Sequence, residues 1–205
     1  WYANSHFAAD GIPLFVDVFT EDHAFDVPQT EQILQAGQAA GMLATIHVDQ
    51  FSAFGGTQMA TTLGAISADH LDVSGPEEIA ALAESNTIAV PLPAANFNLG
   101  HELSGYPDGR AMVDAGCALA LATDLNPGSA PCYSMPLVMA ISNRVMRLTP
   151  AETLIASTIN SAHACSMADR VGSIEVGKMA DLLILKTADW RHLSYFFGGN
   201  PVETV

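Results

Sequence analysis

The stretch IPLFVDVFTEDHAFDVPQTEQILQAGQAAGMLATIH, residues 12–47, decides the fold class of this chain. It begins with an apolar run, Ile12 to Phe19, that is typical of a buried strand. The segment from Pro28 to Gly41 carries apolar residues near one face and ends in glycine, which predicts a helix. Leu43 to His47 is apolar again and predicts a second strand. A strand, a helix and a further strand in this order indicate βα units and a parallel sheet.

The same alternation continues to residue 124. The predicted helices are Gly56 to Gly64, a helix that starts at Ser74 as its N-cap and runs to about Ser85, and Arg110 to Gly116. The further predicted strands are Ala65 to Leu71, Thr87 to Leu92 and Cys117 to Thr123. Five strands therefore precede residue 125. A doubly wound sheet and a piece of a (β/α)₈ barrel both fit this α/β pattern.

After Asp124 the pattern changes. Two helices are predicted, Met135 to Leu148 and Ala151 to Cys165, with Thr149 as the cap of the second. The segment GSIEVGKMAD, residues 172–181, then predicts a turn that leads into the strand Leu182 to Leu185. This turn and strand depart from the βα alternation, so we expect a second, small β region.

Composition excludes several classes of function. Hydrophobic residues make up 49% of the 205 residues, which is enough for a sizeable core, and 7 Lys and Arg face 22 Asp and Glu. Nucleic acid is therefore not an expected partner, because phosphate binding needs basic patches. The sequence contains no run of about 20 apolar residues, so a membrane span is not predicted. Three scattered cysteines without a CxxC pair, and Trp1 to His6 without signal-peptide character, favour the cytoplasm.

Polar side chains that can bind metal follow three predicted strands. His47 ends LATIH, His70 nearly ends its strand in ISADH and Asp124 ends ALALATD. In parallel α/β folds, ligands and catalytic groups gather at that edge of the sheet. Imidazole and carboxylate together suit zinc or iron. The plainer interpretations are hydrogen-bonded structural histidines and, for Asp124, a turn within Asp-Leu-Asn-Pro-Gly-Ser. Two ligands are also too few for a stable site, and no third has matching spacing.

The motifs around these residues resemble those of the imidazolonepropionases, which are metal-dependent hydrolases of the amidohydrolase superfamily. His47-Val48-Asp49-Gln50 resembles their fifth-strand signature and Ser67 to Leu71 (SADHL) their sixth. Thr123 to Ser129 (TDLNPGS) resembles their eighth-strand motif, and Asp17-Val18-Phe19 with Glu21 resembles the fourth strand. The segment 172–181 resembles the return into the small β domain that many amidohydrolases share.

The resemblance implies the C-terminal half of a (β/α)₈ TIM barrel, with about strands 4 to 8 in residues 1–170. Residues 171–205 would begin the C-terminal part of a composite β-sandwich. The implied reaction is the hydrolytic ring opening of 4-imidazolone-5-propanoate to N-formimino-L-glutamate in histidine degradation.

The resemblance also implies a role for each matching residue. His47 and Asp124 would bind one divalent or trivalent metal ion, zinc or iron. Asp124 would also handle the proton of the attacking water, and His70 would stabilise charge or orient that water. Gln50 would hydrogen-bond the substrate, as an amide that cannot act as a general base. Further substrate contacts would come from Asn126, Gly128 and Ser129. A homodimer is expected by analogy only.

The chain departs from the family in lacking the HxH pair of the first strand. We therefore expect a fragment, and we expect these 205 residues alone to bind metal poorly and to show no turnover. Two alternatives stay open. One is another amidohydrolase, a cyclic amidase or an aminohydrolase acting on a related heterocycle. The other is a non-catalytic barrel fragment.

Overall fold

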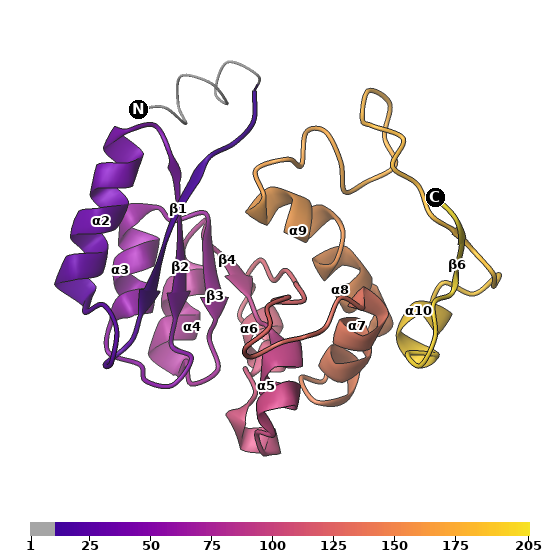
Figure 1. Ribbon diagram of the computed structural model, residues 1–205, viewed down its shortest axis with the longest axis horizontal. Coiled ribbons are helices and arrows are strands. Elements are labelled where there is room, and N and C mark those ends of the chain that lie inside the picture. The colour runs from indigo at the N-terminus through magenta and orange to yellow at the C-terminus, as the bar shows by residue number, and fades with distance from the viewer. Residues whose placement is uncertain (1–10) are drawn as a thin grey trace. The chain divides into compact units, whose positions relative to one another are not determined.

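The computed structural model describes residues 11–205, and its elements are drawn in Figure 1. The expectation about Trp1 to His6 lies outside the described residues. The chain divides into two compact units. Unit 1 extends to Val90 and adds Ala111–Ala118, and unit 2 comprises Pro91–Arg110 and Leu119–Val205. Between residues 11 and 205, no helix has both the length and the apolar character needed to cross a membrane.

Unit 1 contains the parallel sheet that the sequence predicts. Its four strands are β1 (Phe15–Thr20), β2 (Leu43–Val48), β3 (Ser67–His70) and β4 (Ile88–Val90), in the order β1-β2-β3-β4. All three strand pairs are parallel. The register places Phe19 beside His47 and His47 beside Asp69, so equivalent positions of neighbouring strands form rows across the sheet.

Three helices connect these strands: α2 (Val27–Ala39), α3 (Gly56–Leu63) and α4 (Pro76–Ala83). Figure 1 shows α2 and α3 on the same side of the sheet. Asp26 caps α2 through a capping box with Gln29, which fixes where the helix begins. The prediction of Ser74 as the cap of α4 is wrong. Gly75 is the N-cap, and the Ser74 hydroxyl donates instead to Asp49.

The alternation of side chains along β2 divides the sheet into two faces. Ala44, Ile46 and Val48 are buried, whereas Thr45 and His47 keep part of their surface exposed. Successive side chains of a strand point to opposite faces, so Thr45 and His47 share the face that the buried residues do not occupy. This second face carries the polar groups of the candidate site.

The segment Cys117 to Thr123, predicted as a strand, does not form a regular one. Its backbone groups are satisfied in another way. Ala89 of β4 donates its N–H to the Ala118 carbonyl at 2.9 Å. Within unit 2, the side chains of Asn160 and Ser161 donate to the carbonyls of Leu119 and Leu121, and the Leu121 N–H donates to Ala156. At Leu119 and Leu121, side chains from a helical region therefore take the place of the backbone donors that a further strand would supply.

Unit 2 is mainly helical. Its elements are α5 (Pro93–Leu99), η2 (Leu103–Gly105), the start of α6 (Gly109–Asp114), α7 (Met135–Arg144), α8 (Pro150–Ala156), α9 (Ile159–Ala164), β5 (Ile184–Leu185), α10 (His192–Tyr195) and β6 (Val202–Thr204). The sequence pattern does not predict α5, η2 or α10. The Thr149 cap of α8 is confirmed by its capping box with Glu152. The single helix predicted over Ala151 to Cys165 breaks at Thr158, whose φ of −126° and ψ of −94° are not helical.

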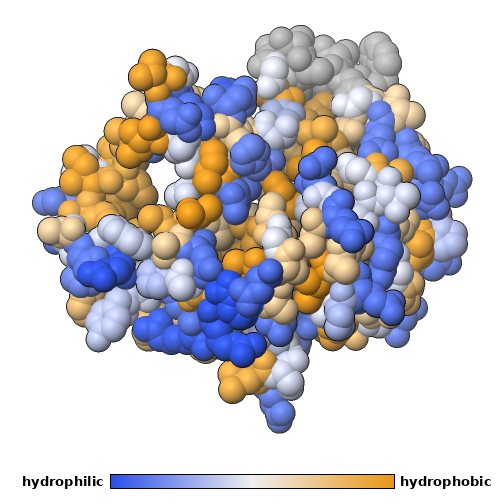
Figure 2. Space-filling view, turned by 180° about the vertical axis from the view of Figure 1, so that it is seen from behind, coloured by the Kyte–Doolittle hydropathy of each residue, from blue (hydrophilic) through white to orange (hydrophobic). Residues whose placement is uncertain are grey.

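The C-terminal segment of unit 2 holds a two-stranded antiparallel sheet, β5 with β6. Several of its apolar side chains are exposed, among them Ile174, Val176, Leu183 and Phe196. Figure 2 shows such apolar groups on the surface over this segment, on the left of the view. These apolar side chains are therefore not buried by the residues that the structure describes.

Candidate functional site

His47 occupies the carboxyl end of β2 and faces a carboxylate. Its Nδ1 lies 2.7 Å from Oδ2 of Asp17 on β1. The other oxygen of Asp17, Oδ1, accepts a hydrogen bond from the Thr45 hydroxyl at 2.9 Å. A carboxylate at one ring nitrogen of a histidine fixes the ring and favours coordination of a metal through the other nitrogen. In His47 that other nitrogen is Nε2.

His70 ends β3 and lies beside His47, with 5.4 Å between the ring centroids. The backbone of His70 has a φ of 77°, so the chain leaves the extended conformation at this residue. Only 3% of His70 is exposed. Burial, together with the neighbouring His47, lowers the pKa of His70 to about 4, although Asp17 raises it. His70 is therefore a neutral imidazole at pH 7, with one nitrogen to donate and one to accept.

Asp17, His47 and Asp69 form a group whose potential ligand atoms lie within 4.8 Å of one another. Imidazole and carboxylate are donors that suit zinc or iron, but Asp17 lies at Nδ1 of His47, where it orients the ring and does not add a ligand at Nε2. Asp17 and Asp69 lie in motifs quoted from the sequence, but neither was predicted as a site residue. The register of the strands could have identified them. Asp69 pairs with His47 on one side, and Phe19, two residues after Asp17, pairs with His47 on the other.

Gln50 belongs to the loop that follows β2 and is 7% exposed. The preceding residue, Asp49, is fully buried and has a φ of 53°. Its Oδ2 accepts hydrogen bonds from Thr57 at 2.7 Å and from Ser74 at 2.8 Å. Burial raises the pKa of the Asp49 carboxyl, although these two hydrogen bonds lower it. Asp49 therefore ties the Gln50 loop to the starts of two helical segments.

The segment from Asp124 to Ala130 forms a compact loop in unit 2. Asn126 organises it, because its Oδ1 accepts the N–H groups of Gly128 at 2.9 Å and Ser129 at 2.7 Å. Its Nδ2 donates to the Asp124 carbonyl at 2.7 Å. The Ser129 hydroxyl donates to Oδ2 of Asp124 at 3.3 Å. Asn126 thus acts as an Asx turn, and the N–H groups of Gly128 and Ser129 are engaged within the loop.

The expected site residues are thus found in two groups. In unit 1, His47 and His70 lie together, and Gln50 follows in the same loop as Asp49. In unit 2, Asp124, Asn126, Gly128 and Ser129 are joined by hydrogen bonds. Each group is ordered by its own contacts.

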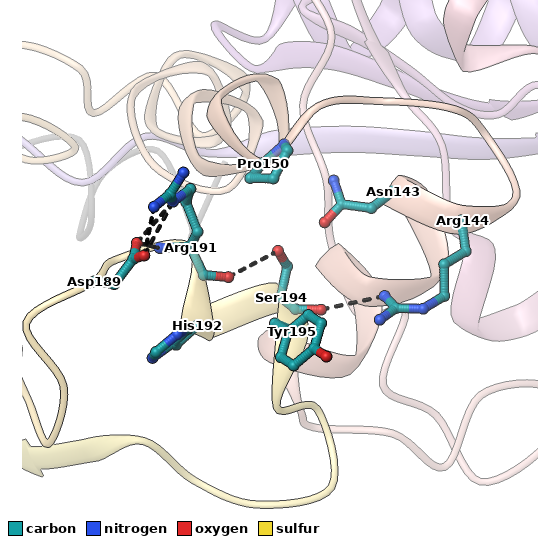
Figure 3. A pocket seen from close by; sticks show the side chains of 8 residues that line it. All are labelled: Asn143, Arg144, Pro150, Asp189, Arg191, His192, Ser194 and Tyr195. Atoms are coloured by element: carbon teal, nitrogen blue, oxygen red, sulfur yellow. Dashed lines mark hydrogen bonds and ion pairs between the residues drawn. The ribbon is translucent and has the colours of Figure 1, made fainter.

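Unit 2 also has a cavity of about 520 Å³ between α7 and the α10 region, shown in Figure 3. Its cationic side chains are already engaged. Arg191 forms an ion pair with Asp189 at 2.6 Å, and Arg144 donates to the carbonyls of Ala140 and Ser194. None of the expected site residues lines this cavity. Because Arg144, Asp189 and Arg191 all have protein partners, the cavity does not present a free charge to a small ligand.

Comparison with known proteins identifies similar sequences. The model of the amidohydrolase family matches residues 23–205. The imidazolonepropionase of Chloroflexus aggregans is 54% identical over 205 residues, which is 100% of this chain and 48% of that protein. The imidazolonepropionase of Herpetosiphon aurantiacus is 50% identical over 193 residues, or 94% of this chain and 45% of that protein. The chain therefore spans about half the length of these relatives.

Solved structures share the fold at lower sequence identity. An adenosine deaminase from Xanthomonas campestris with bound zinc has a TM-score of 0.71 and 23% identity, over 89% of this chain and 47% of that chain. The ochratoxinase of A. niger has a TM-score of 0.72 and 18% identity, over 92% of this chain and 48% of that chain. The family model covers residues 23–205, which is most of the sequence, and the chain belongs to the amidohydrolase family.

Proposed function

We propose that this chain is part of an imidazolonepropionase, a cytoplasmic enzyme that opens the ring of 4-imidazolone-5-propanoate with water. The product is N-formimino-L-glutamate, an intermediate of histidine degradation. The observation that carries the proposal is the 54% identity to the Chloroflexus aggregans imidazolonepropionase over all 205 residues. The matched region covers the whole chain and so includes the segments that hold the polar groups at the ends of β2 and β3.

We propose that the chain forms the C-terminal half of a (β/α)₈ barrel, residues 1–170, followed by the start of a β-sandwich, residues 171–205. Two observations support this architecture. The chain matches only 48% of the length of its Chloroflexus relative. The exposed apolar side chains around β5 and β6 are the kind of surface that further sandwich strands would cover.

The proposal assigns His47 and Asp124 as protein ligands of one zinc or iron ion. The donor chemistry fits, because Asp17 lies at Nδ1 of His47 and leaves Nε2 as the coordinating nitrogen. A bound metal ion of this kind lowers the pKa of water and supplies a nucleophile near neutral pH. Further ligands would come from the part of the relatives that this chain does not match.

The protein's own groups then orient the substrate and move the proton. Asp124 accepts the proton of the attacking water, and its carboxylate is oriented by the Ser129 hydroxyl. Neutral His70 donates an N–H to the carbonyl oxygen as negative charge develops there. Gln50 hydrogen-bonds the ring, and the loop Asn126, Gly128 and Ser129 contacts the substrate. Attack at the carbonyl carbon breaks the ring C–N bond, and the freed nitrogen takes up a proton.

The experiment uses the full-length protein that carries these residues, assayed with imidazolone propanoate, a hydantoin and cytosine. We expect turnover of imidazolone propanoate, and its loss in His47→Ala. The matched control is His163→Ala, which changes an exposed histidine of α9 and should keep the activity. Turnover of the hydantoin or cytosine alone would indicate a different amidohydrolase. Sedimentation of the same protein tests the homodimer that we expect by analogy.

A further inference from the structure

Glu21 is a buried carboxylate directly after β1, and only 1% of the residue is exposed. Its Oε1 accepts the backbone N–H groups of Gln50 at 3.0 Å, Phe51 at 2.9 Å and Ser52 at 3.4 Å. Its Oε2 accepts the Ser52 hydroxyl at 2.6 Å. Four donors from three consecutive residues of one loop therefore meet at a single side chain of the neighbouring strand.

These contacts are of a strong type. A hydrogen bond to an ionised acceptor is about twice as strong as a neutral one. A buried carboxylate also needs such donors, because an unpaired charge away from water is costly. The main chain of Glu21 is held as well, since its N–H donates to the Phe25 carbonyl and its own carbonyl accepts from Ala24. Glu21 thus joins the end of β1 to the loop after β2 with little freedom on either side.

The loop is fixed on both sides of the peptide that carries Gln50. Asp49 is anchored through its side chain to Thr57 and Ser74. Its φ of 53° is a left-handed conformation that costs a non-glycine residue energy and persists only where surrounding contacts impose it. The Glu21 contacts begin at the very next N–H.

We propose that Glu21 is the positioning residue for Gln50, and so sets the place from which this amide meets the substrate ring. The inference rests on the proposed function, which makes Gln50 a substrate-binding residue. Glu21 itself acts only through the loop. Glu21→Gln replaces one carboxylate oxygen by an NH₂ group, which is a donor. This NH₂ group would face other donors, either the backbone N–H groups or the Ser52 hydroxyl, so the loop would have to move away from it.

The test compares Glu21→Gln, Gln50→Ala and the double variant in the full-length protein. A displacement of about 1 Å at a substrate-positioning group can lower the rate by about 100-fold. We therefore expect Glu21→Gln to lower kcat/KM by about 10- to 100-fold. In the Gln50→Ala background the same change should lower kcat/KM by less than about 3-fold, because residues of one network are not additive. Ser52→Ala, which removes one of the four contacts, should have a smaller effect.

Thr87→Val is the matched control for a loss of buried hydrogen bonding in the same unit. Thr87 is 2% exposed, and its hydroxyl donates to the Ala65 carbonyl at 2.8 Å, away from the Gln50 loop. We expect this variant to lower the melting temperature and to leave kcat/KM within about twofold, as for a change outside the site. If Thr87→Val and Glu21→Gln reduce kcat/KM equally, or if Glu21→Gln and Gln50→Ala are additive, the inference is overturned.

Amide hydrogen exchange of the free protein gives a readout that needs no turnover. Glu21→Gln should accelerate exchange at residues 50–52, whereas Thr87→Val should not. Unchanged protection of these amides in Glu21→Gln would overturn the inference. If the wild-type protein does not hydrolyse imidazolone propanoate, the proposed function fails, and the exchange measurement still decides whether Glu21 positions the loop.

Discussion

The ion pair between Arg110 and Glu152 supports a quantitative prediction about the stability of unit 2. The guanidinium donates through Nη1 and Nη2 to the two carboxylate oxygens of Glu152, at 3.0 and 3.1 Å. Glu152 also accepts the Thr149 N–H at 2.7 Å in the capping box of α8. The hydrogen bond with Arg110 is the main cause that lowers the pKa of Glu152 from 4.5 to about 2. Glu152→Gln removes the charge and keeps an oxygen for the cap.

The magnitude follows from that pKa. A fall from 4.5 to about 2 corresponds to at most about 3.4 kcal/mol of stability at neutral pH. The side chains of Arg110 and Glu152 are 25% and 29% exposed, so water screens part of the interaction. We therefore expect Glu152→Gln to lower the free energy of unfolding by about 1 to 2 kcal/mol at pH 7.

The sign of the pH dependence is fixed by the lowered pKa. A carboxylate with a folded-state pKa below its unfolded value adds stability above the unfolded pKa, and this stability is lost as the pH falls through the folded pKa. The difference between wild type and Glu152→Gln should thus shrink between pH 4.5 and pH 2. At pH 3.5 about 60% of the pH 7 difference in the free energy of unfolding should remain.

The assay is urea unfolding of the full-length protein at pH 7 and pH 3.5. Glu31→Gln is the control, because Glu31 is exposed on α2 and its carboxylate accepts a hydrogen bond from the neutral Gln35 side chain. That variant should change the free energy of unfolding by no more than about 0.5 kcal/mol. The reasoning is refuted if Glu152→Gln is as stable as wild type at pH 7, or if its deficit grows as the pH falls.

Three further predictions follow from the packing and the site. In Gly37→Ala, the new Cβ would lie 2.3 Å from Cγ1 of Val16. Thermal unfolding should therefore show a free energy of unfolding lower by about 1 to 3 kcal/mol, despite the better helix propensity of alanine. A more stable variant would contradict the packing of α2 on β1. Asp17→Asn should weaken metal binding about 10- to 100-fold in a competition with a chelator, because the carboxylate at Nδ1 of His47 is lost. Asp22→Asn, which changes an exposed carboxylate, is the control. Equal metal affinities of Asp17→Asn and the wild-type protein would exclude Asp17 as the partner of His47. Removal of metal by a chelator should abolish turnover, and added zinc or iron should restore it, whereas unchanged activity of the metal-free protein would contradict a metal-dependent reaction.

The sequence predicted the sheet of unit 1 well because its signals are local. The apolar run before His47 and the glycine that ends the predicted helix Gly56 to Gly64 each act within a few residues. These signals locate strands and helices without knowledge of the rest of the chain. The parallel order of β1 to β4 then follows from the alternation of strands and helices.

The failures concern contacts between residues far apart in sequence. Cys117 to Thr123 has the composition of a strand, but the carbonyls of Leu119 and Leu121 are satisfied by Asn160 and Ser161, about 40 residues later. Ser74 has the side chain of a good cap, yet its hydroxyl bonds to Asp49. Periodicity and local propensity contain no information about such partners.

The same limit applies to the candidate site. His47 and His70 were recognisable because a polar residue at the end of an apolar strand is conspicuous. Asp17 and Glu21 became candidates only when the register of β1 and β2 was known, because their importance lies in what they contact across the sheet. The motif that contains them marked the fourth strand but not their individual roles.

The central claim is that these residues belong to a hydrolase that opens an imidazolone ring with water. The most direct measurement follows the reaction of the full-length protein with imidazolone propanoate in ¹⁸O-labelled water by mass spectrometry. We predict N-formimino-L-glutamate with one ¹⁸O atom in the carboxylate formed from the ring carbonyl, and no product above background with His47→Ala. Absence of this product from the wild-type protein, or equal formation by wild type and His47→Ala, would contradict the claim.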